Sequence, residues 1–298
     1  MADLDDGAGA GGSVTDGVRL ALGTLTVFRT RGPWVVDRAG AGLAMVLAPV
    51  VGLLLAVPLT VLLWLAGYAP SGDRTFVWRL LGHLPGSLHP PSPLVVAVLV
   101  VGLLALLTRG LHLDGLADTA DGLGSGKPAE QALAVMRRSD IGPFGVVTLV
   151  LVLGLQVAAV AQLLGTGRGV LGVTFALVVS RLALPLACLR GTPAARGDGL
   201  GVAVAGTVSP LWLLTSGGLA VAATAGYGAL VVVLWWGYLA WPSVAVALTL
   251  VAGAGVALVV GWLFVRRCVH RLGGITGDVL GASVEITLSV VLLLLTFL

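Results

Sequence analysis

Charged side chains are scarce in this chain, and their scarcity excludes an ordinary soluble domain. Asp, Glu, Lys and Arg make up 10% of the 298 residues, whereas soluble domains contain about 25%. Hydrophobic residues make up 57%, and the mean hydropathy is +1.05. A chain of this composition has too few polar side chains to cover a soluble fold, so we expect an integral membrane protein.

Cysteine is also scarce, and the net charge is small. The two cysteines, Cys188 and Cys268, show no pairing pattern, so no disulfide framework is expected. A net charge of +3 is too small to indicate a nucleic-acid partner. Residues 1–16 are acidic, small and glycine-rich, which predicts a disordered tail before one membrane-embedded domain at 17–298. The tail lacks the basic start and apolar core of a signal peptide.

Long apolar runs fill most of the remaining sequence. A helix of about 20 apolar residues crosses the hydrocarbon core of a bilayer. The sequence therefore predicts an all-α, polytopic bundle of about seven transmembrane helices, preceded by an amphipathic helix at 17–28. The expected spans are 41–66, 93–108, 144–165, 169–190, 211–236, 243–265 and 284–298.

The basic residues divide unequally between the two sets of loops that these spans create. One set carries only Arg74, Arg79 and Arg168, and the other carries most of the rest. Cytoplasmic loops carry an excess of Lys and Arg, so the basic set is expected in the cytoplasm. The polar motifs fall in the same set, which predicts an active site at the cytoplasmic face. The basic set comprises 1–40, 109–143, 190–210 and 266–283.

Three carboxylates follow the second apolar run within eight positions. Asp114, Asp118 and Asp121 stand at i, i+4 and i+7, so on a helix they share one face. Like charges at that spacing repel unless a cation neutralises them, and oxygen ligands suit Mg²⁺, which is usually bound together with substrate phosphates. A solvated acidic turn is the structural alternative. His112, two residues upstream, is either a base beside this site or an interfacial structural residue.

Arginines in the same loops and spans are candidate phosphate ligands. Arg137 and Arg138 end a short helix expected at 129–138, although basic residues there also serve as membrane anchors. Arg181 lies inside an apolar span, where a guanidinium needs a partner, either a site group or an interhelical carboxylate. Arg196 lies in a glycine-rich loop that fits an anion.

The last cytoplasmic loop opens the final apolar helix with a dense polar cluster. Thr276, Gly277 and Asp278 stand at its start, where exposed backbone amides bind phosphate well. Asp278 is a candidate base or additional metal ligand. Glu285 lies further into the helix, where a carboxylate is costly unless it is used.

Carboxylates, a metal and arginines at a membrane surface suit a reaction on a diphosphate. One such reaction transfers a phosphoester group to an alcohol with loss of a nucleoside monophosphate. The other is the ionisation of a prenyl diphosphate. The residues alone leave both open.

The motifs also resemble a known family. In order along the chain, the carrying segments are 110–122, 136–142, 180–181, 195–201 and 273–282, with a looser match at 28–33. In these segments the sequence resembles the cobalamin synthase family, also called adenosylcobinamide-GDP ribazoletransferase. The resemblance spans most of the chain, and its first and last blocks together are highly specific.

The resemblance implies an activity and a set of roles. The reaction joins adenosylcobinamide-GDP to α-ribazole or its 5′-phosphate and releases GMP, with Mg²⁺ as cofactor, at the plasma (inner) membrane of a bacterium. A homo-oligomer and a complex with other late corrinoid enzymes are expected partners beside the lipid bilayer, and nucleic acid is not. The implied metal ligands are Asp114, Asp118 and Asp121. Further catalytic candidates are Asp278, Glu285 and His112, and the substrate-binding candidates are Arg137, Arg181, Arg196, Thr276 and Gly277.

Three other classes remain as alternatives. A Mg²⁺-dependent membrane prenyltransferase uses Asp-rich segments, but predicts a second Asp-rich block where this chain offers only Asp278. The segment 118–122 also resembles part of the CDP-alcohol phosphotransferase signature. A transporter would place its charges near the bilayer midplane, whereas here all but Arg181 cluster at one surface.

Overall fold

The computed structural model describes residues 14–30, 37–68, 91–236 and 244–297. Most of the predicted tail, together with Arg74 and Arg79, lies outside these residues. Within them the regular structure is helical, and extended pairing is limited to two isolated bridges. The helices are α1 (Val14–Leu25), α2 (Arg38–Val46), α3 (Ala48–Leu65), α5 (Pro93–Leu107), α6 (Leu111–Gly124), α7 (Ala129–Val135), α8 (Pro143–Gly165), α9 (Gly169–Arg181), α10 (Ala183–Ala187), α11 (Gly199–Val204), α12 (Pro210–Trp236), α13 (Val244–Leu272) and α14 (Gly277–Leu295).

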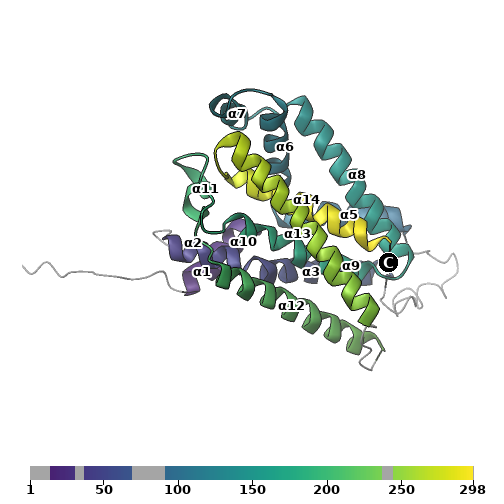
Figure 1. Cartoon of the computed structure of the whole chain (residues 1–298). Helices are drawn as coiled ribbons and strands as arrows, with labels where there is room; N and C mark the ends of the chain where they lie inside the picture. The colour runs from purple at the N-terminus through teal and green to yellow at the C-terminus, as the bar shows by residue number, and fades with distance from the viewer. Residues whose placement is uncertain (1–13, 31–36, 69–90, 237–243, 298) are drawn as a thin grey trace, which may run out of the picture.

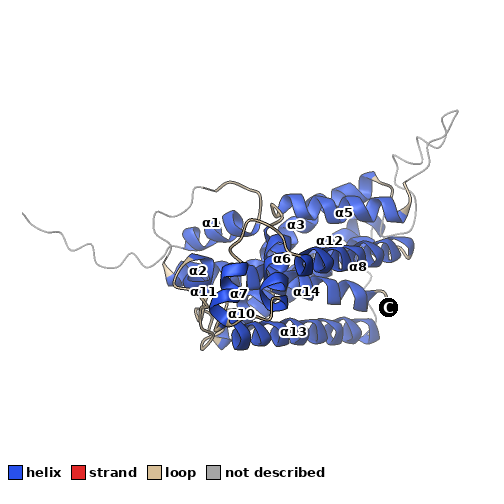
Figure 2. Ribbon diagram, turned by 90° about the horizontal axis from the view of Figure 1, so that it is seen from above, coloured by secondary structure: helices blue, strands red, loops and turns tan. Residues whose placement is uncertain are grey.

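The all-α membrane architecture is confirmed. Six helices or helix pairs in the described residues are long and apolar enough to cross a bilayer, and the bent pair α5 and α6 raises the total to seven. The long helices run side by side, while α1, α2, α7 and α11 gather at one end (Figure 2). The chain terminus marked C lies at the opposite end (Figure 1). We call the end that carries α7 and α11 the polar end.

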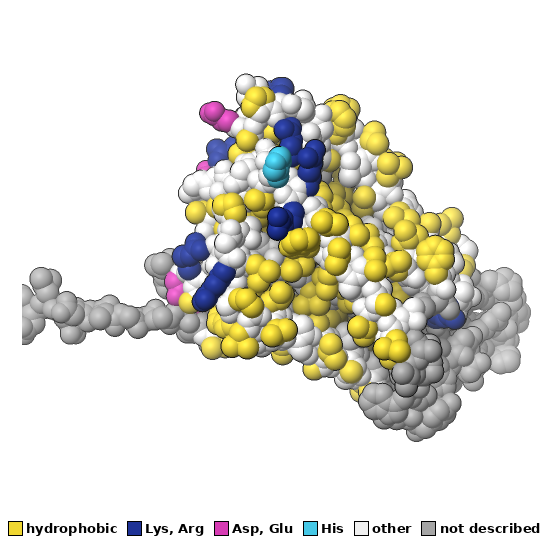
Figure 3. Space-filling model, in the orientation of Figure 1, with side chains coloured by type: hydrophobic (Ala, Val, Ile, Leu, Met, Phe, Trp, Pro, Cys, Tyr) yellow, Lys and Arg dark blue, Asp and Glu magenta, His cyan; other side chains and the backbone are white. Residues whose placement is uncertain are grey.

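The surface agrees with this division. Lys, Arg and the acidic side chains gather at the polar end, and apolar side chains cover much of the visible face of the bundle (Figure 3). Exposed apolar residues such as Val150, Leu151 and Leu214 belong to the long helices, where a bilayer rather than water would surround them.

Helix α6 departs from the direction of the bundle. It is bent by 89° from α5, across a turn in which Arg109 and Gly110 both adopt positive φ. α5 is apolar and α6 carries the three aspartates, and the two helices are long enough to cross a bilayer only when taken together as this bent pair. The side chain of Arg109 holds the turn by donating to the carbonyl of Gly23 at 2.9 Å.

Two predicted spans are broken in ways that proline explains. The span expected at 169–190 divides into α9 and α10 at Leu182. Pro185 lies four residues after Arg181, so its ring opposes the Arg181 carbonyl and it offers no N–H to the helix. The span expected at 41–66 divides into α2 and α3, with Pro49 in the first turn of α3.

The final helix begins earlier than the apolar run indicates. α14 starts at Gly277 rather than 284, because Thr276 caps it and accepts a hydrogen bond from the Val279 amide at 3.2 Å. Asp278 therefore lies in its first turn and Glu285 two turns further in. Likewise, α1 begins at Val14, within the predicted tail, and ends at Leu25.

Candidate active site

The three aspartates of α6 lie in different surroundings. Asp114 is exposed, Asp118 is half-buried, and Asp121 is buried with 7% of its surface accessible. The helical arrangement expected from their spacing is confirmed. Their neighbours differ, and so do the roles open to each of them.

Asp121 holds the start of α8. Its two carboxylate oxygens accept hydrogen bonds from the amides of Gly142 at 2.7 Å and Gly145 at 2.9 Å. A carboxylate at a helix N-terminus also interacts favourably with the helix dipole. The two glycines are needed for this approach, because a Cβ at either position would come within 2.5 Å of an Asp121 oxygen. Asp121 thus fixes α8 against α6, and a metal-binding role for it stays a prediction.

The start of α14 brings Asp278 to α6. The Thr276 hydroxyl lies 3.2 Å from Asp278 Oδ2, to which it donates, and orients that carboxylate. Gly115 of α6 lies directly against the backbone of Asp278, where a Cβ would be 2.7 Å from its carbonyl oxygen. One turn along α14, Gly281 lies against the backbone of His112, where a Cβ would be 3.0 Å from the His112 Cα. These two glycines let the helix backbones approach closely, as in other membrane helix pairs.

Arg196 joins the loop before α11 to the point where α6 and α14 cross. Its Nη1 lies 3.6 Å from Asp278 Oδ2, and its Nη2 donates to the Leu133 carbonyl at 2.9 Å. The Ala195 amide donates to the Ile275 carbonyl at 3.0 Å, which fixes the loop beside the start of α14. The Nε of Arg196 is buried and has no hydrogen-bond partner in the described residues. Arg196 therefore retains a donor for a further acceptor.

The electrostatics of the crossing reveal an excess of negative charge. The pKa of Asp118 is raised to about 7, first by burial, then by the charges of Asp114, Asp278 and Asp121, against an opposing effect of Arg196. Carboxylates from α6 and α14 are thus close enough to disfavour one another's ionisation. A bound cation would relieve that repulsion.

A cavity of about 260 Å³ opens beside these carboxylates. Asp118 and Asp121 line one part of it, and Arg138 and Asp140 contribute charged groups from the segment between α7 and α8. It lies at the polar end, where sequence analysis expected the chemistry. The remaining lining residues are Ser125, Val135, Gly142, Pro143 and Phe144.

Arg137 has a partner that sequence analysis did not identify. Its Nη2 donates to both carboxylate oxygens of Asp198, at 2.7 and 2.9 Å. Both side chains are more than half exposed, so this pair links the segment after α7 to the start of α11 at the surface. Its proposed phosphate contact stays a prediction.

Three other predicted site residues form a separate, buried cluster. His112, Arg181 and Glu285 are 5%, 1% and 4% exposed. His112 Nδ1 lies 3.9 Å from Glu285 Oε1, and the charge of Arg181 acts on both. Gln156 of α8 completes the cluster by donating to Glu285 Oε2 at 2.8 Å. Arg181 donates from Nη1 to the Ser180 hydroxyl at 2.9 Å, whereas its Nε and Nη2 have no hydrogen-bond partner in the described residues, so both the interhelical and the substrate-binding interpretations stay predictions.

Gln156 was missed, although its signal was present. It is a large amide in the middle of the apolar run at 144–165, where a polar side chain needs a partner as much as Arg181 does. It also donates to Ser289 at 3.1 Å, so α8 and α14 are joined at two points.

The described residues offer carboxylate donors for a metal ion, but not a complete set of protein ligands. In the described part of the chain, no group of three or more His, Cys, Asp or Glu side chains is arranged to hold a metal ion. Mg²⁺ does not need such a cage, because it usually keeps several waters and takes one or two carboxylates together with substrate phosphates. The charges of Asp114, Asp278 and Asp121 all act on Asp118, which makes these carboxylates the candidates for that role.

Comparison with known proteins decides between the alternatives. The model of the cobalamin-5-phosphate synthase family matches residues 17–296. The chain belongs to this family. It is 42% identical to an adenosylcobinamide-GDP ribazoletransferase of Frankia casuarinae over 93% of each chain. It is 40% identical to the enzyme of that name from a Nocardioides species, over 93% of this chain and 97% of the relative.

A third relative with the same name, from Corynebacterium efficiens, is 34% identical over 94% of this chain and 91% of its own. No solved structure matches the chain. These relatives favour the ribazoletransferase interpretation over a prenyltransferase or a CDP-alcohol phosphotransferase. The sequence resemblance to this family is therefore confirmed.

Proposed function

We propose that this chain transfers the adenosylcobinamide phosphate group from adenosylcobinamide-GDP to α-ribazole or its 5′-phosphate. The products are adenosylcobalamin, or its 5′-phosphate, and GMP. The observation that carries this proposal is the meeting of Asp114 and Asp118 from α6 with Asp278 from α14, beside the free donor of Arg196. Full-length similarity to ribazoletransferases supplies the reaction class.

The diphosphate of the donor substrate would bind at this crossing. Asp114 and Asp118 would hold Mg²⁺, which neutralises charge on the diphosphate when it is bound. Arg196 would direct its unpaired Nε–H toward a phosphate oxygen. The backbone amides of Gly277 and Asp278 at the start of α14 would provide further anion contacts.

The acceptor reacts through a hydroxyl group. The 3′-hydroxyl of α-ribazole attacks the phosphorus that carries the cobinamide arm, forming a new P–O bond, and the bond to the GMP oxygen breaks. The hydroxyl proton passes to a carboxylate. Asp278 suits that role better than Glu285, because its side chain is 25% exposed, whereas that of Glu285 is 6% exposed.

The buried cluster of His112, Glu285 and Arg181 would position the site without touching the substrate. Their burial leaves no direct route to a corrinoid substrate in the structure described. They lie where α6, α8, α9 and α14 meet, so they would keep α6 and its aspartates in place. Thr276 would serve similarly, by orienting Asp278.

The membrane setting of the reaction is part of the proposal. We infer that the polar end faces the cytoplasm of a bacterium, because it carries most of the basic residues. The protein would lie in the plasma membrane, as a homo-oligomer or in a complex with other late corrinoid enzymes.

Corrinoid product analysis tests the proposed reaction. Purified protein in liposomes, supplied with adenosylcobinamide-GDP and Mg²⁺, should form a cobalamin product only when α-ribazole or its 5′-phosphate is added. Formation of the product with Glu130→Gln, an exposed carboxylate on α7, and its loss with Asp114→Asn would support the proposal. Absence of product with folded wild-type protein would refute it.

A further inference from the structure

A second cavity lies within the apolar part of the bundle, away from the carboxylates. It has a volume of about 430 Å³, within the range of about 300–1,000 Å³ that is common for ligand sites. Its wall is apolar throughout. The lining residues are Leu182, Leu186, Leu213, Gly217, Leu258, Val259 and Trp262.

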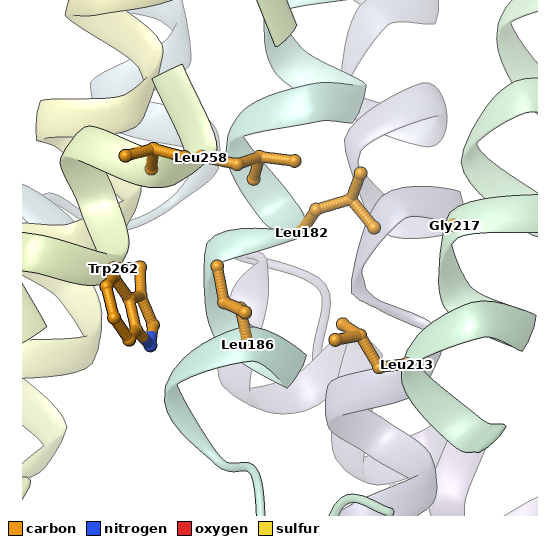
Figure 4. A pocket seen from close by; sticks show the side chains of 7 residues that line it. Leu182, Leu186, Leu213, Gly217, Leu258 and Trp262 are labelled. Carbon is orange, nitrogen blue, oxygen red and sulfur yellow. The ribbon is translucent and has the colours of Figure 1, made fainter. Parts of the chain in front are cut away.

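The cavity follows from how α12 and α13 pack. α12 packs on α3 and α9, whereas α13 packs on α14, so the two consecutive long helices are held by different neighbours. Leu182 and Leu186, at the break between α9 and α10, lie between them (Figure 4). Leu213 from α12 and Trp262 from α13 flank these leucines on opposite sides (Figure 4).

Two basic residues follow the cavity residue Trp262 along one face of α13. Trp262, Arg266 and His270 follow one another at intervals of four residues, so they lie on neighbouring parts of one helix face. The guanidinium of Arg266 lies over the Trp262 ring, 4.9 Å from its centroid. Arg266 is exposed and forms no salt bridge with any described residue. An apolar cavity thus adjoins, near the polar end, a cation that has no acidic partner in the described residues.

We propose that one anionic phospholipid binds here, with an acyl chain in the cavity and its phosphate on Arg266. The apolar wall matches the chain, and the charge of Arg266 matches the headgroup. Trp262 suits the boundary between them, because tryptophan is favoured at membrane interfaces. Basic pockets between transmembrane helices are a recurring form of lipid headgroup site.

Native mass spectrometry of the intact protein tests this site. The protein would be released from vesicles that contain phosphatidylglycerol and phosphatidylcholine in equal amounts. Wild type should retain one phosphatidylglycerol in preference to phosphatidylcholine. Arg266→Gln should lower that preference by about fivefold, the value expected for one basic residue near a membrane surface.

Two further variants separate this site from a general attraction to lipid. Arg267→Gln removes the same charge from a face turned by about 100° and should keep the preference. Leu213→Trp fills the cavity and should lower the retention of both lipids. Equal loss of preference in the two arginine variants, an unchanged preference in Arg266→Gln, or a dimer in place of the retained lipid would overturn the proposal.

Discussion

Asp118 and Asp121 lie three residues apart on α6, yet their surroundings separate their functions. Asp121 has both oxygens on the amides that begin α8, whereas Asp118 faces other carboxylates and a cavity. One residue therefore contributes mainly to structure, and the other is available for chemistry. Substitutions at the two positions should have different consequences.

Asp118→Asn should abolish most of the activity without unfolding the protein. The amide keeps the shape of the side chain but removes the charge that a cation requires, and we expect a loss of about 10²–10³-fold in kcat, as for the removal of one strong electrostatic contact. Steady-state GMP release measures it. Glu130→Gln is the matched control, and equal activity of the two variants would contradict the role of Asp118.

Asp121→Ala should destabilise the protein. It removes the acceptor for two amides at the start of α8, and loss of a helix cap costs about 1–2 kcal/mol. Thermal unfolding in detergent, monitored by circular dichroism, measures the change. Asp140→Ala, which removes an exposed carboxylate nearby, should have little effect. Unchanged stability of Asp121→Ala would show that the hydrogen bonds to Gly142 and Gly145 are not important.

At the scale of elements, the crossing of α6 and α14 positions the site. Gly115→Ala would place a methyl group 2.7 Å from the Asp278 carbonyl, so the helices must separate. A displacement of about 1 Å at a reacting centre costs about 100-fold in rate, and we expect a loss of that size in kcat. Gly102→Ala on α5, where the added Cβ meets nothing within 4 Å, should remain active. Full activity of Gly115→Ala would show that this packing does not set the geometry.

The buried cluster joins α8 to α14 and should contribute to stability. Gln156→Leu leaves the Glu285 carboxylate without its hydrogen bond, and an unsatisfied buried polar group costs about 1–3 kcal/mol. Gln162→Leu on the same helix is the control, because Gln162 makes an exposed bond to the Thr296 carbonyl at 3.1 Å. Thermal unfolding of both variants gives the comparison, and equal effects would argue against a special role for Gln156.

Elements differed in how well the sequence predicted them. The runs of α8 and α12 were predicted within one residue at each end, because apolar length dominates there. The breaks in two spans were missed, although Pro185 and Pro49 mark them. The pairing of Asp278 with Arg196, and of Glu285 with Gln156, joins segments 82 and 129 residues apart, and only tertiary packing brings them together.

At the scale of the whole molecule, the two ends of the bundle should face different compartments. Ser139 lies at the polar end and Thr166 in the turn between α8 and α9, and both are exposed. Both native cysteines are buried, so wild type should react little. A membrane-impermeant maleimide should label Thr166→Cys in intact cells, and Ser139→Cys only after permeabilisation. The reverse pattern would invert the proposed orientation.

The most direct measurement for the whole account is single-turnover release of GMP by protein in liposomes. The mixture contains adenosylcobinamide-GDP, α-ribazole and Mg²⁺, with and without each component. We predict release that needs both the acceptor and the metal, is lost in Asp118→Asn, and persists in Glu130→Gln. GMP release that does not depend on the acceptor, or that is retained in Asp118→Asn, would contradict phosphoryl transfer at the crossing of α6 and α14.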